Sequence, residues 1–503
     1  MGTSAEFEAA HRATAEVLRA TRAVERLWAN DHTLWQTEAA DCADRLGWRD
    51  EPARLAHRAI EVTRDVDELR NVGVDSVVWC GMGGSSLFPE LIARAPAPRT
   101  DPIAFAVLDS SHPAPVRRII EQPAGAERLY VFASKSGGTI ETRTQLATLT
   151  EAHPAALVGV VTDPGSDLAA LAEDRGWSTW LSNPEIGGRF SAFSTFGALA
   201  AALVGVDVAA LANAGQGMND RCRNDTDNPA VELAVFLAAA HTVGRDKLTL
   251  ITPPTMAGFG AWVEQLVAES TGKHGVGILP VVDEPIGGPD LYGNDRCFVS
   301  YGDVAALGAL RDAGHPVFDL GPFVPTSLGA ELQRWMLATA WVGAALGINP
   351  FDQPDVERAK SSARAALDSE NPESPSPGDP SRLLASLRAG DHIVVQAFVD
   401  PAGSIATQLD EVRDRLRAAY RCAVTVGIGP RYLHSTGQLH KGGPNSGVFL
   451  QILGTALDDV RIPGNDFGFA RLLAAQADGD FEALVASGRR VVRCSVPAIL
   501  ACI

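Results

Sequence analysis

Short apolar runs alternate with helical patterns along most of the chain. Residues 1–70 contain few glycines and many Ala, Arg and Glu, a composition that favours helices. Beyond them, β-rich apolar runs recur between amphipathic stretches, at Ser76–Cys80, Leu129–Ala133, Ala156–Thr162, Leu248–Thr252 and Val276–Val281. This alternation predicts mainly parallel sheets flanked by helices, and therefore an α/β fold. A second, separate sheet is expected from Lys247 onward, because a helical pattern at Ser191–Val206 intervenes.

The later part of the chain predicts a third folded unit. The stretch SENPESPSPGDP at 369–380 is rich in proline, serine and acid, which is typical of a linker. Beyond it, His392–Val399 and Ala423–Val426 have strand patterns around a predicted helix at Ile405–Tyr420. The expected organisation is listed by residue number: a helical segment 1–70, an α/β domain 71–190, a second α/β domain 191–365, a linker 366–384, and a small α/β unit 385–503.

Charge and cysteine content limit the class of function. Forty-three Lys and Arg against 61 Asp and Glu give a net charge of −18, which argues against a nucleic-acid partner. An anionic substrate would therefore need a locally positive pocket. The seven cysteines form neither a CxxC pair nor a Cys/His metal spacing, which indicates reduced thiols in a cytoplasmic protein without a bound metal.

Two apolar or terminal segments bear on the question of a membrane. The longest apolar stretch, Ser191–Gly215, is rich in Ala and Gly and contains Asp207, so we expect a buried helix rather than a membrane span. The first twenty residues lack the apolar core of a signal peptide and suit an amphipathic surface helix. No membrane association is expected.

Two glycine-rich loops each follow a predicted strand and precede a predicted helix. The first is GMGGSSL at 81–87, and the second is SKSGGTIE at 134–141. Glycines allow backbone N–H groups to approach an anion, and the following helix start adds unpaired donors and a favourable dipole. Together the loops suit a phosphate monoester, although either alone is also compatible with a tight β–α turn. A dinucleotide site is disfavoured, because the first loop lacks the third glycine of GxGxxG.

Glu269 is the first candidate for a catalytic group. The segment Phe259–Lys273 predicts a helix that ends at Gly272, and Glu269 continues its apolar stripe. A partly desolvated carboxylate near the negative end of a helix dipole has a raised proton affinity, which suits a general base. The alternative is a surface ion pair with Lys273 at i,i+4 spacing.

Three further polar residues follow from local patterns. Arg189 lies in GGRFS just before a predicted helix, where its guanidinium could meet negative charge developing on oxygen. Gln353 and Lys360 are seven apart in NPFDQPDVERAK, whose start has capping signals, so they share one helix face. An ordinary structural ion pair for the arginine and a solvated position for the lysine are the competing interpretations.

Taken in order, GMGGSSL, SKSGGTIET, GGRFS, AESTGK and NPFDQPDVERAK resemble the phosphoglucose isomerase family across residues 81 to 360. The resemblance implies two sugar-isomerase-type α/β/α sandwich domains and a hexose phosphate substrate. It further implies interconversion of glucose 6-phosphate and fructose 6-phosphate through a cis-enediolate, as in glycolysis and gluconeogenesis. No metal or other cofactor is implied, and a homodimer is possible.

The resemblance also implies residue roles. Glu269 would be the base, Arg189 beside Gly188 would stabilise the enediolate, and Lys360 with Gln353 would assist ring opening. The sugar phosphate would be held by the residues that occupy the family's phosphate-loop positions: Gly83, Gly84, Ser85, Ser134, Lys135, Ser136 and Thr139.

One element departs from the family pattern. The family usually supplies a ring-opening histidine in a stretch that corresponds roughly to Glu284–Arg296, which contains none here. The segment Gly429–Asn445 is similar to the end of bifunctional transaldolase/phosphoglucose isomerase proteins, and the 70 N-terminal residues are too few for a transaldolase barrel. We hypothesise that His434 or His440 replaces the missing group; a glycine-rich turn whose histidines bond the backbone is the alternative.

Two other functions stay open on the sequence. A sugar-phosphate sensor could use the same loops without chemistry, because a fold and a phosphate site do not prove catalysis. An isomerase of another hexose phosphate, such as mannose 6-phosphate, is the second alternative.

Overall fold

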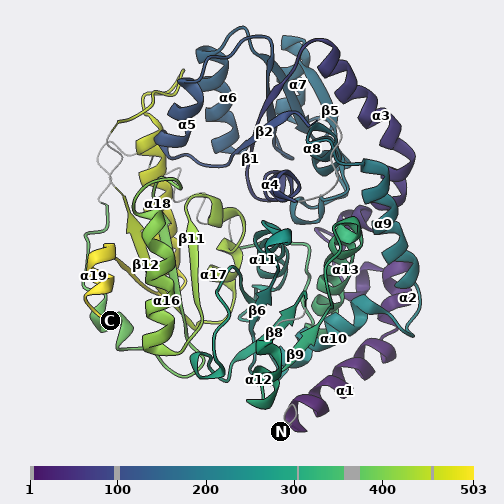
Figure 1. Cartoon of the computed structure of the whole chain (residues 1–503), viewed down its shortest axis with the longest axis vertical. Coiled ribbons are helices and arrows are strands. Elements are labelled where there is room, and N and C mark those ends of the chain that lie inside the picture. The colour runs from purple at the N-terminus through teal and green to yellow at the C-terminus, as the bar shows by residue number, and fades with distance from the viewer. Residues whose placement is uncertain (1–4, 96–101, 303–304, 356–366, 368–373, 455–457) are drawn as a thin grey trace.

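The computed structural model describes residues 5–95, 102–302, 305–355, 367, 374–454 and 458–503. Its described strands form three parallel sheets, which confirms the predicted α/β fold (Figure 1). The first sheet has the order β2-β1-β3-β4-β5, with bounds Ala104–Leu108, Ser76–Gly81, Arg128–Ala133, Leu157–Thr162 and Ser178–Leu181. The second has the order β7-β6-β8-β9, with bounds Leu279–Val281, Lys247–Ile251, Arg296–Ser300 and Val317–Asp319. The third has the order β11-β10-β12-β13, with bounds Val424–Ile428, His392–Phe398, Gly447–Leu453 and Arg490–Arg493.

All three sheets share one strand order. In each, the first strand in sequence lies between the second and the third, and the fourth follows the third. This order creates a switch point between the first and third strands, and ligands of open α/β sheets bind beyond the carboxyl ends of the strands at such points. In the first sheet the switch point lies between β1 and β3, whose following loops are the two predicted phosphate loops.

Helices cover the sheets and join them. The N-terminal and linking helices are α1 Ala5–Ala20, α2 Ala23–Trp28, α3 Glu51–Asn71, α8 Thr195–Leu203, α9 Val208–Arg221 and α15 Ser381–Leu384. The helices between strands of the first and second sheets, together with α13, are α4 Leu87–Arg94, α5 Pro113–Ile120, α6 Ile140–Ala152, α7 Asp167–Arg175, α10 Pro229–Thr242, α11 Phe259–Thr271, α12 Ala306–Asp312 and α13 Leu328–Leu346. Those of the third are α16 Leu409–Tyr420, α17 Gly437–Gly442, α18 Phe469–Ala486 and α19 Val496–Leu500.

The apolar stretch at 191–215 forms parts of two helices rather than one, a buried helix α8 and a half-buried helix α9. All nine residues of α8 are buried, and the chain then turns at Asp207, whose side chain accepts a hydrogen bond from Ala210 N at 2.9 Å and so caps α9. The helix break follows from this N-cap, which satisfies a backbone donor at the start of α9. Within the described ranges, no helix is both long and apolar enough to cross a membrane.

The third unit packs against both other sheets, with α11 and α17 adjacent near the centre of the molecule (Figure 1). Arg431, just after β11, forms ion pairs with Glu90 of α4 and with Asp109 at 3.1 Å. Burial opposes the ionised form of the Glu90 carboxyl, but Arg431 outweighs it and lowers the pKa of Glu90. This arginine therefore holds the third unit against the first sheet, beside its carboxyl edge.

Candidate active site

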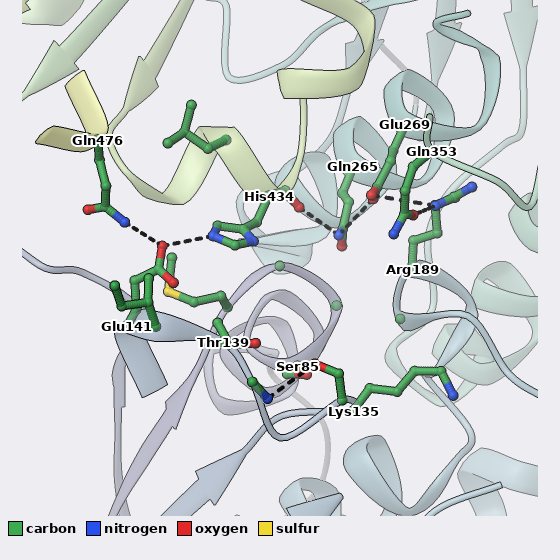
Figure 2. A pocket seen from close by; sticks show the side chains of 18 of the residues that line it. Ser85, Lys135, Thr139, Glu141, Arg189, Gln265, Glu269, Gln353, His434 and Gln476 are labelled. Carbon is green, nitrogen blue, oxygen red and sulfur yellow. Dashed lines mark hydrogen bonds and ion pairs between the residues drawn. The ribbon is translucent and has the colours of Figure 1, made fainter. Parts of the chain in front are cut away.

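A cavity of about 750 Å³ lies where the three units meet (Figure 2). It lies beyond the carboxyl edge of the first sheet, and α11, α17 and α18 contribute to its walls. Of the predicted site residues, it is lined by Gly83, Gly84, Ser85, Lys135, Ser136, Thr139, Gly188, Arg189, Glu269, Gln353 and His434. The structure thus brings together groups that are up to about 350 residues apart in the sequence.

The two glycine-rich loops lie side by side because β1 and β3 are in register. Gly81 pairs with Ala133 at the end of the ladder, so both strands deliver their loops to the same edge. Thr139 occupies the N-cap position of α6 without a side-chain capping bond, and its Oγ1 lies 2.9 Å from Oγ of the buried Ser134. Ser134 is not itself in the cavity lining; it supports Thr139 from behind. The helix start of α6 therefore faces the cavity with hydroxyl groups around it.

Glycines at 83 and 84 are required by close packing around the first loop. A Cβ on Gly84 would lie 2.0 Å from the carbonyl oxygen of Gly188. Gly83 has a φ of +55°, and a Cβ there would lie 2.7 Å from the carbonyl oxygen of His434. These contacts seat the Arg189 loop and the His434 segment directly on the first loop, so the glycines serve the assembly of the site as well as access to an anion.

Lys135 lies at the cavity wall with its ammonium already bonded. It forms an ion pair with Asp163 and donates to the carbonyl oxygen of Pro184 at 2.8 Å. Figure 2 shows its side chain extending away from Ser85, toward the side of the cavity where Arg189 lies. Its charge is therefore shared with Asp163 rather than directed at the hydroxyl groups of the second loop.

Arg189 and Glu269 form the charged centre of the site. The guanidinium Nη1 lies 3.5 Å from Glu269 Oε1 and donates to Gln353 Oε1 at 2.6 Å. Its Nε donates to Ser270 Oγ at 2.9 Å, and its Nη2 donates to the carbonyl oxygens of Pro350 and Asp352 at 2.8 and 2.9 Å. Burial lowers the pKa of Arg189, partly offset by the nearby carboxylates. The guanidinium is thus held rigidly, beside a carboxylate that faces the cavity.

Glu269 projects inward from the last turn of α11, as the helix pattern predicts. Its side chain is 12% exposed and accepts a hydrogen bond from Gln265 Nε2 at 3.1 Å. The alternative of a surface ion pair with Lys273 is wrong. Lys273 is fully buried, and its ammonium donates to Asn349 O and Asp352 O at 2.7 Å and to Asp352 Oδ1 at 2.5 Å.

Lys273 therefore has a structural role beside the site. Its contacts tie the end of α11 to the segment around Asp352, which also supplies the acceptors and the Gln353 side chain that bind Arg189. Burial and the charge of Arg189 lower the pKa of Lys273 to about 8, partly offset by Asp352. The contacts to this one segment orient Gln353 and Arg189 together.

His434 reaches the cavity from the third unit. It ends a short 3₁₀ turn after β11, and its Nε2 lies 2.9 Å from Oε1 of Glu141 in the first turn of α6. Its carbonyl oxygen accepts from Gln265 Nε2 at 2.8 Å, so the same amide group joins His434 to Glu269 (Figure 2). Hence the glycine-rich turn brings a histidine and the catalytic-base candidate to one wall.

The other ring-opening candidates lie elsewhere. His440 is buried behind the wall, with Nδ1 3.3 Å from Gln396 Nε2, and burial holds its pKa well below the usual value. None of Glu284–Arg296 lines the cavity; Glu284 and Arg296 instead form a buried ion pair at 2.9 Å. Lys360 lies outside the described residues.

Sequence reasoning missed several cavity residues. These are Arg45, Glu141, Asp163, Gln265, Lys441 and Gln476, with Glu141 and Gln476 among the most buried. Glu141 lies within the second glycine-rich loop, and Lys441 lies within the 429–445 segment. Both could have been predicted as site residues from these motifs. Gln476 lies in an ordinary amphipathic helix and carried none. Among the described residues, no group of three or more His, Cys, Asp or Glu side chains could hold a metal ion.

The α/β fold is similar to that of a solved sugar isomerase. A glucose-6-phosphate isomerase from Chlamydia trachomatis superimposes with a TM-score of 0.59 at 15% identity, covering 72% of this chain and 87% of that one. At that identity the likeness establishes the fold of the two sugar-isomerase domains, not an activity.

Sequence comparison finds similarity to glucose-6-phosphate isomerases. A glucose-6-phosphate isomerase from Nostoc punctiforme is 25% identical over 426 residues, which cover 73% of this chain and 77% of that protein. Another, from Thermosynechococcus vestitus, is 30% identical over 355 residues, which cover 58% of this chain and 65% of that protein. No family model matches the chain.

Proposed function

We propose that this chain is an aldose–ketose isomerase that interconverts glucose 6-phosphate and fructose 6-phosphate. The distant relatedness to glucose-6-phosphate isomerases supports sugar-phosphate isomerisation in general. The observation that carries the specific proposal is the Glu269–Arg189 pair, 3.5 Å apart and on the same cavity as two loops suited to a phosphate. The segment 429–445, which contains His434, is similar to the end of bifunctional transaldolase/phosphoglucose isomerase proteins. This similarity further supports a kinship with their isomerase half.

The proposed cycle uses the chain's own groups in sequence. Ser85, Ser136 and Thr139, with the helix start of α6, hold the phosphate, and its binding energy positions the sugar for proton transfer. Glu269 removes the proton from C2 of the open-chain aldose and returns it to C1. Arg189 stabilises the enediolate oxygens between the two transfers.

Ring opening must precede proton transfer for a cyclic sugar. We assign this acid/base role to His434, which enters the cavity beside the phosphate loops and whose carbonyl oxygen is joined to Glu269 through Gln265. Lys360 stays a predicted helper, seven residues beyond Gln353. The substrate is a hexose phosphate, which is an anion. Although the chain has a net charge of −18, four cations line the cavity: Arg45, Lys135, Arg189 and Lys441.

The test is conversion of fructose 6-phosphate by the wild type and by Glu269→Gln, with glucose 6-phosphate and mannose 6-phosphate both measured. We expect glucose 6-phosphate as the main product and a loss of kcat of about 10²–10⁴-fold in the variant, with little change in KM, because a general base contributes that much to rate. Binding of the sugar phosphate without turnover by the wild type would instead support a sensor, and mannose 6-phosphate as the main product would change the assigned substrate.

A further inference from the structure

Four side chains form a continuous hydrogen-bonded relay that ends at His434. Ser111 Oγ lies 2.5 Å from Gln476 Oε1, Gln476 Nε2 lies 2.7 Å from Glu141 Oε1, and Glu141 Oε1 lies 2.9 Å from His434 Nε2. Ser111, Glu141 and Gln476 are each at most 5% exposed. Ser111 and Glu141 belong to the first sheet's domain, whereas Gln476 and His434 belong to the third unit, so the relay crosses the interface between them (Figure 2).

The chemistry of Glu141 fixes the direction of every hydrogen bond in this relay. Burial alone would raise its pKa, but the interaction with His434, which is strongest when that imidazole is protonated, and the hydrogen bond from Gln476 outweigh burial and lower the pKa of Glu141, so its carboxylate is the acceptor. An ionised carboxylate can only accept hydrogen bonds. Gln476 must therefore present its NH₂ group to Glu141 and its Oε1 to the Ser111 hydroxyl, and His434 must carry a proton on Nε2.

This arrangement leaves Nδ1 as the reactive nitrogen of His434. Within the described part of the chain, Nδ1 has no hydrogen-bond partner that would occupy it. Figure 2 shows the ring between Glu141 and Gln265, with its second nitrogen turned away from Glu141 toward the side where Glu269 lies. A carboxylate on the far nitrogen also stabilises the imidazolium that forms when Nδ1 takes a proton.

Helix α18 holds the side-chain amide of Gln476 in a defined position at the cavity. Leu472, Gln476 and Asp480 are spaced by four residues and share one face of the helix. Leu472 and Gln476 line the cavity, and Asp480 is buried one turn further, where it pairs with Lys441 at 2.5 Å. The ion pair and the apolar contact fix the helix on either side of Gln476, so its amide has a defined position.

We propose that Glu141 and Gln476 are positioning residues for ring opening: they hold His434 with Nε2 protonated and Nδ1 directed at the sugar. This inference rests on the proposed function. In fructose 6-phosphate, Nδ1 takes the proton of the anomeric hydroxyl, the C2–O5 bond breaks as C2 becomes a carbonyl, and Nδ1–H then protonates O5. Because both oxygens are bonded to C2, one nitrogen can serve both, and no proton or electron is left over.

The test compares a cyclic substrate with one that cannot close a ring. In 5-deoxyfructose 6-phosphate the ring-closing hydroxyl is absent, so isomerisation needs Glu269 and Arg189 but no ring opening. In Gln476→Leu, which keeps the size of the side chain but removes the N–H donor, we expect kcat on fructose 6-phosphate to fall about 10-fold. In Glu141→Gln we expect about 100-fold, because the charge that supports the imidazolium is also lost. Both variants should keep kcat on the 5-deoxy substrate within about twofold of wild type.

The matched control is Gln396→Leu, another buried glutamine of the third unit that lies outside the cavity lining. This variant should leave the ratio of kcat on fructose 6-phosphate to kcat on 5-deoxyfructose 6-phosphate unchanged. Should Gln476→Leu fail to fold, Ser111→Ala removes the far end of the relay and should lower the same ratio by about threefold. Equal losses on both substrates, or no loss on either, would overturn the positioning role while the isomerase assignment stands. A wild type that converts neither substrate would overturn the proposed function itself, and this inference with it.

Discussion

Arg189 shows how one buried side chain links the separate parts of the site. Its five donors are engaged by a serine, a glutamine, two backbone carbonyls and the Glu269 carboxylate. The planar guanidinium suits this set, whereas a lysine has a single charged centre and a different reach. Lys273 holds the same 349–353 segment from the opposite side. The site therefore depends on the shape of one cation as much as on its charge.

Substitution Arg189→Lys should lower kcat on fructose 6-phosphate by about 100-fold with a smaller change in KM, because a lysine cannot keep the contacts that hold the positive charge beside the place where negative charge develops in the transition state. Steady-state kinetics measure this directly. Arg22→Lys, in an exposed pair with Glu25, is the matched control and should leave both constants unchanged. Near-wild-type turnover in Arg189→Lys would contradict the proposed role in enediolate stabilisation.

The segment 284–296 binds the third unit to the second sheet. Arg296 and Glu284 are buried as an ion pair, and Arg417 of α16 lies 3.6 Å from Glu284 while donating to Pro285 O at 2.6 Å. The resemblance places a ring-opening histidine in this segment, which contains none. In this chain the segment instead contacts the third unit, which carries His434. The segment that lacks the histidine therefore helps to hold the unit that supplies the candidate replacement.

Substitution Arg417→Met should lower the free energy of unfolding by about 1–3 kcal/mol, because it removes the part-buried hydrogen bond to Pro285 O and leaves the buried Glu284 carboxylate with one cation fewer. Urea denaturation measures this change. Arg415→Met on the same helix removes an exposed i,i+4 pair with Glu411 and should cost less than about 0.5 kcal/mol. Equal effects of the two variants would argue against a docking role for Arg417.

Across the whole molecule, the seven cysteines are free thiols and most of them are buried. Burial raises the pKa of Cys297 from 9.0 to about 12, and the pKa values of Cys422 and Cys494 rise similarly. Above about pH 9 the unfolded chain releases thiol protons that the folded chain retains. The stabilising contribution of these thiols is therefore complete below about pH 9 and is lost progressively as the pH rises toward 12.

The free energy of unfolding should accordingly fall with pH above about 9, with each buried thiol contributing up to about 1.4 kcal/mol per pH unit. Denaturation of the wild type and of Cys297→Ala between about pH 8 and pH 10.5 isolates one thiol. The variant starts less stable because of the cavity it creates, but its decline above pH 9 should be shallower. Parallel curves would show that Cys297 does not titrate differently in the folded state.

The sequence predicted those features that depend on neighbouring residues. The strands β1, β3 and β6 and the helix α11 were located within two residues, because long periodic patterns specify them. The strands that were missed are β2, β5, β8, β9, β12 and β13. β5 and β9 are short and partly exposed at one end of a sheet, whereas β8 and β12 are buried inner strands. The apolar stretch around Asp207 was taken as one buried helix, since periodicity does not reveal a capping residue that separates the buried helix α8 from the half-buried helix α9.

The candidate site likewise has one part that local motifs predict and one part that they do not. Glu269, Arg189 and the two loops belong to local motifs, and their side chains meet in one cavity through the register of β1 with β3 and the direction of α11. The relay of Ser111, Glu141 and Gln476 spans more than 300 residues of sequence, and each member has an ordinary local environment. Such a network depends on how the third unit docks, which no single segment encodes.

Isomerisation of fructose 6-phosphate in D₂O, followed by NMR at C2 of the glucose 6-phosphate formed, tests the central claim most directly. Proton transfer through Glu269 predicts deuterium at C2 with the wild type in the fraction of turnovers in which the carboxyl proton exchanges with solvent before it is returned, and labelled product formed about 10²–10⁴-fold more slowly with Glu269→Gln. A variant that forms labelled product at the wild-type rate would contradict the assignment of Glu269 as the base.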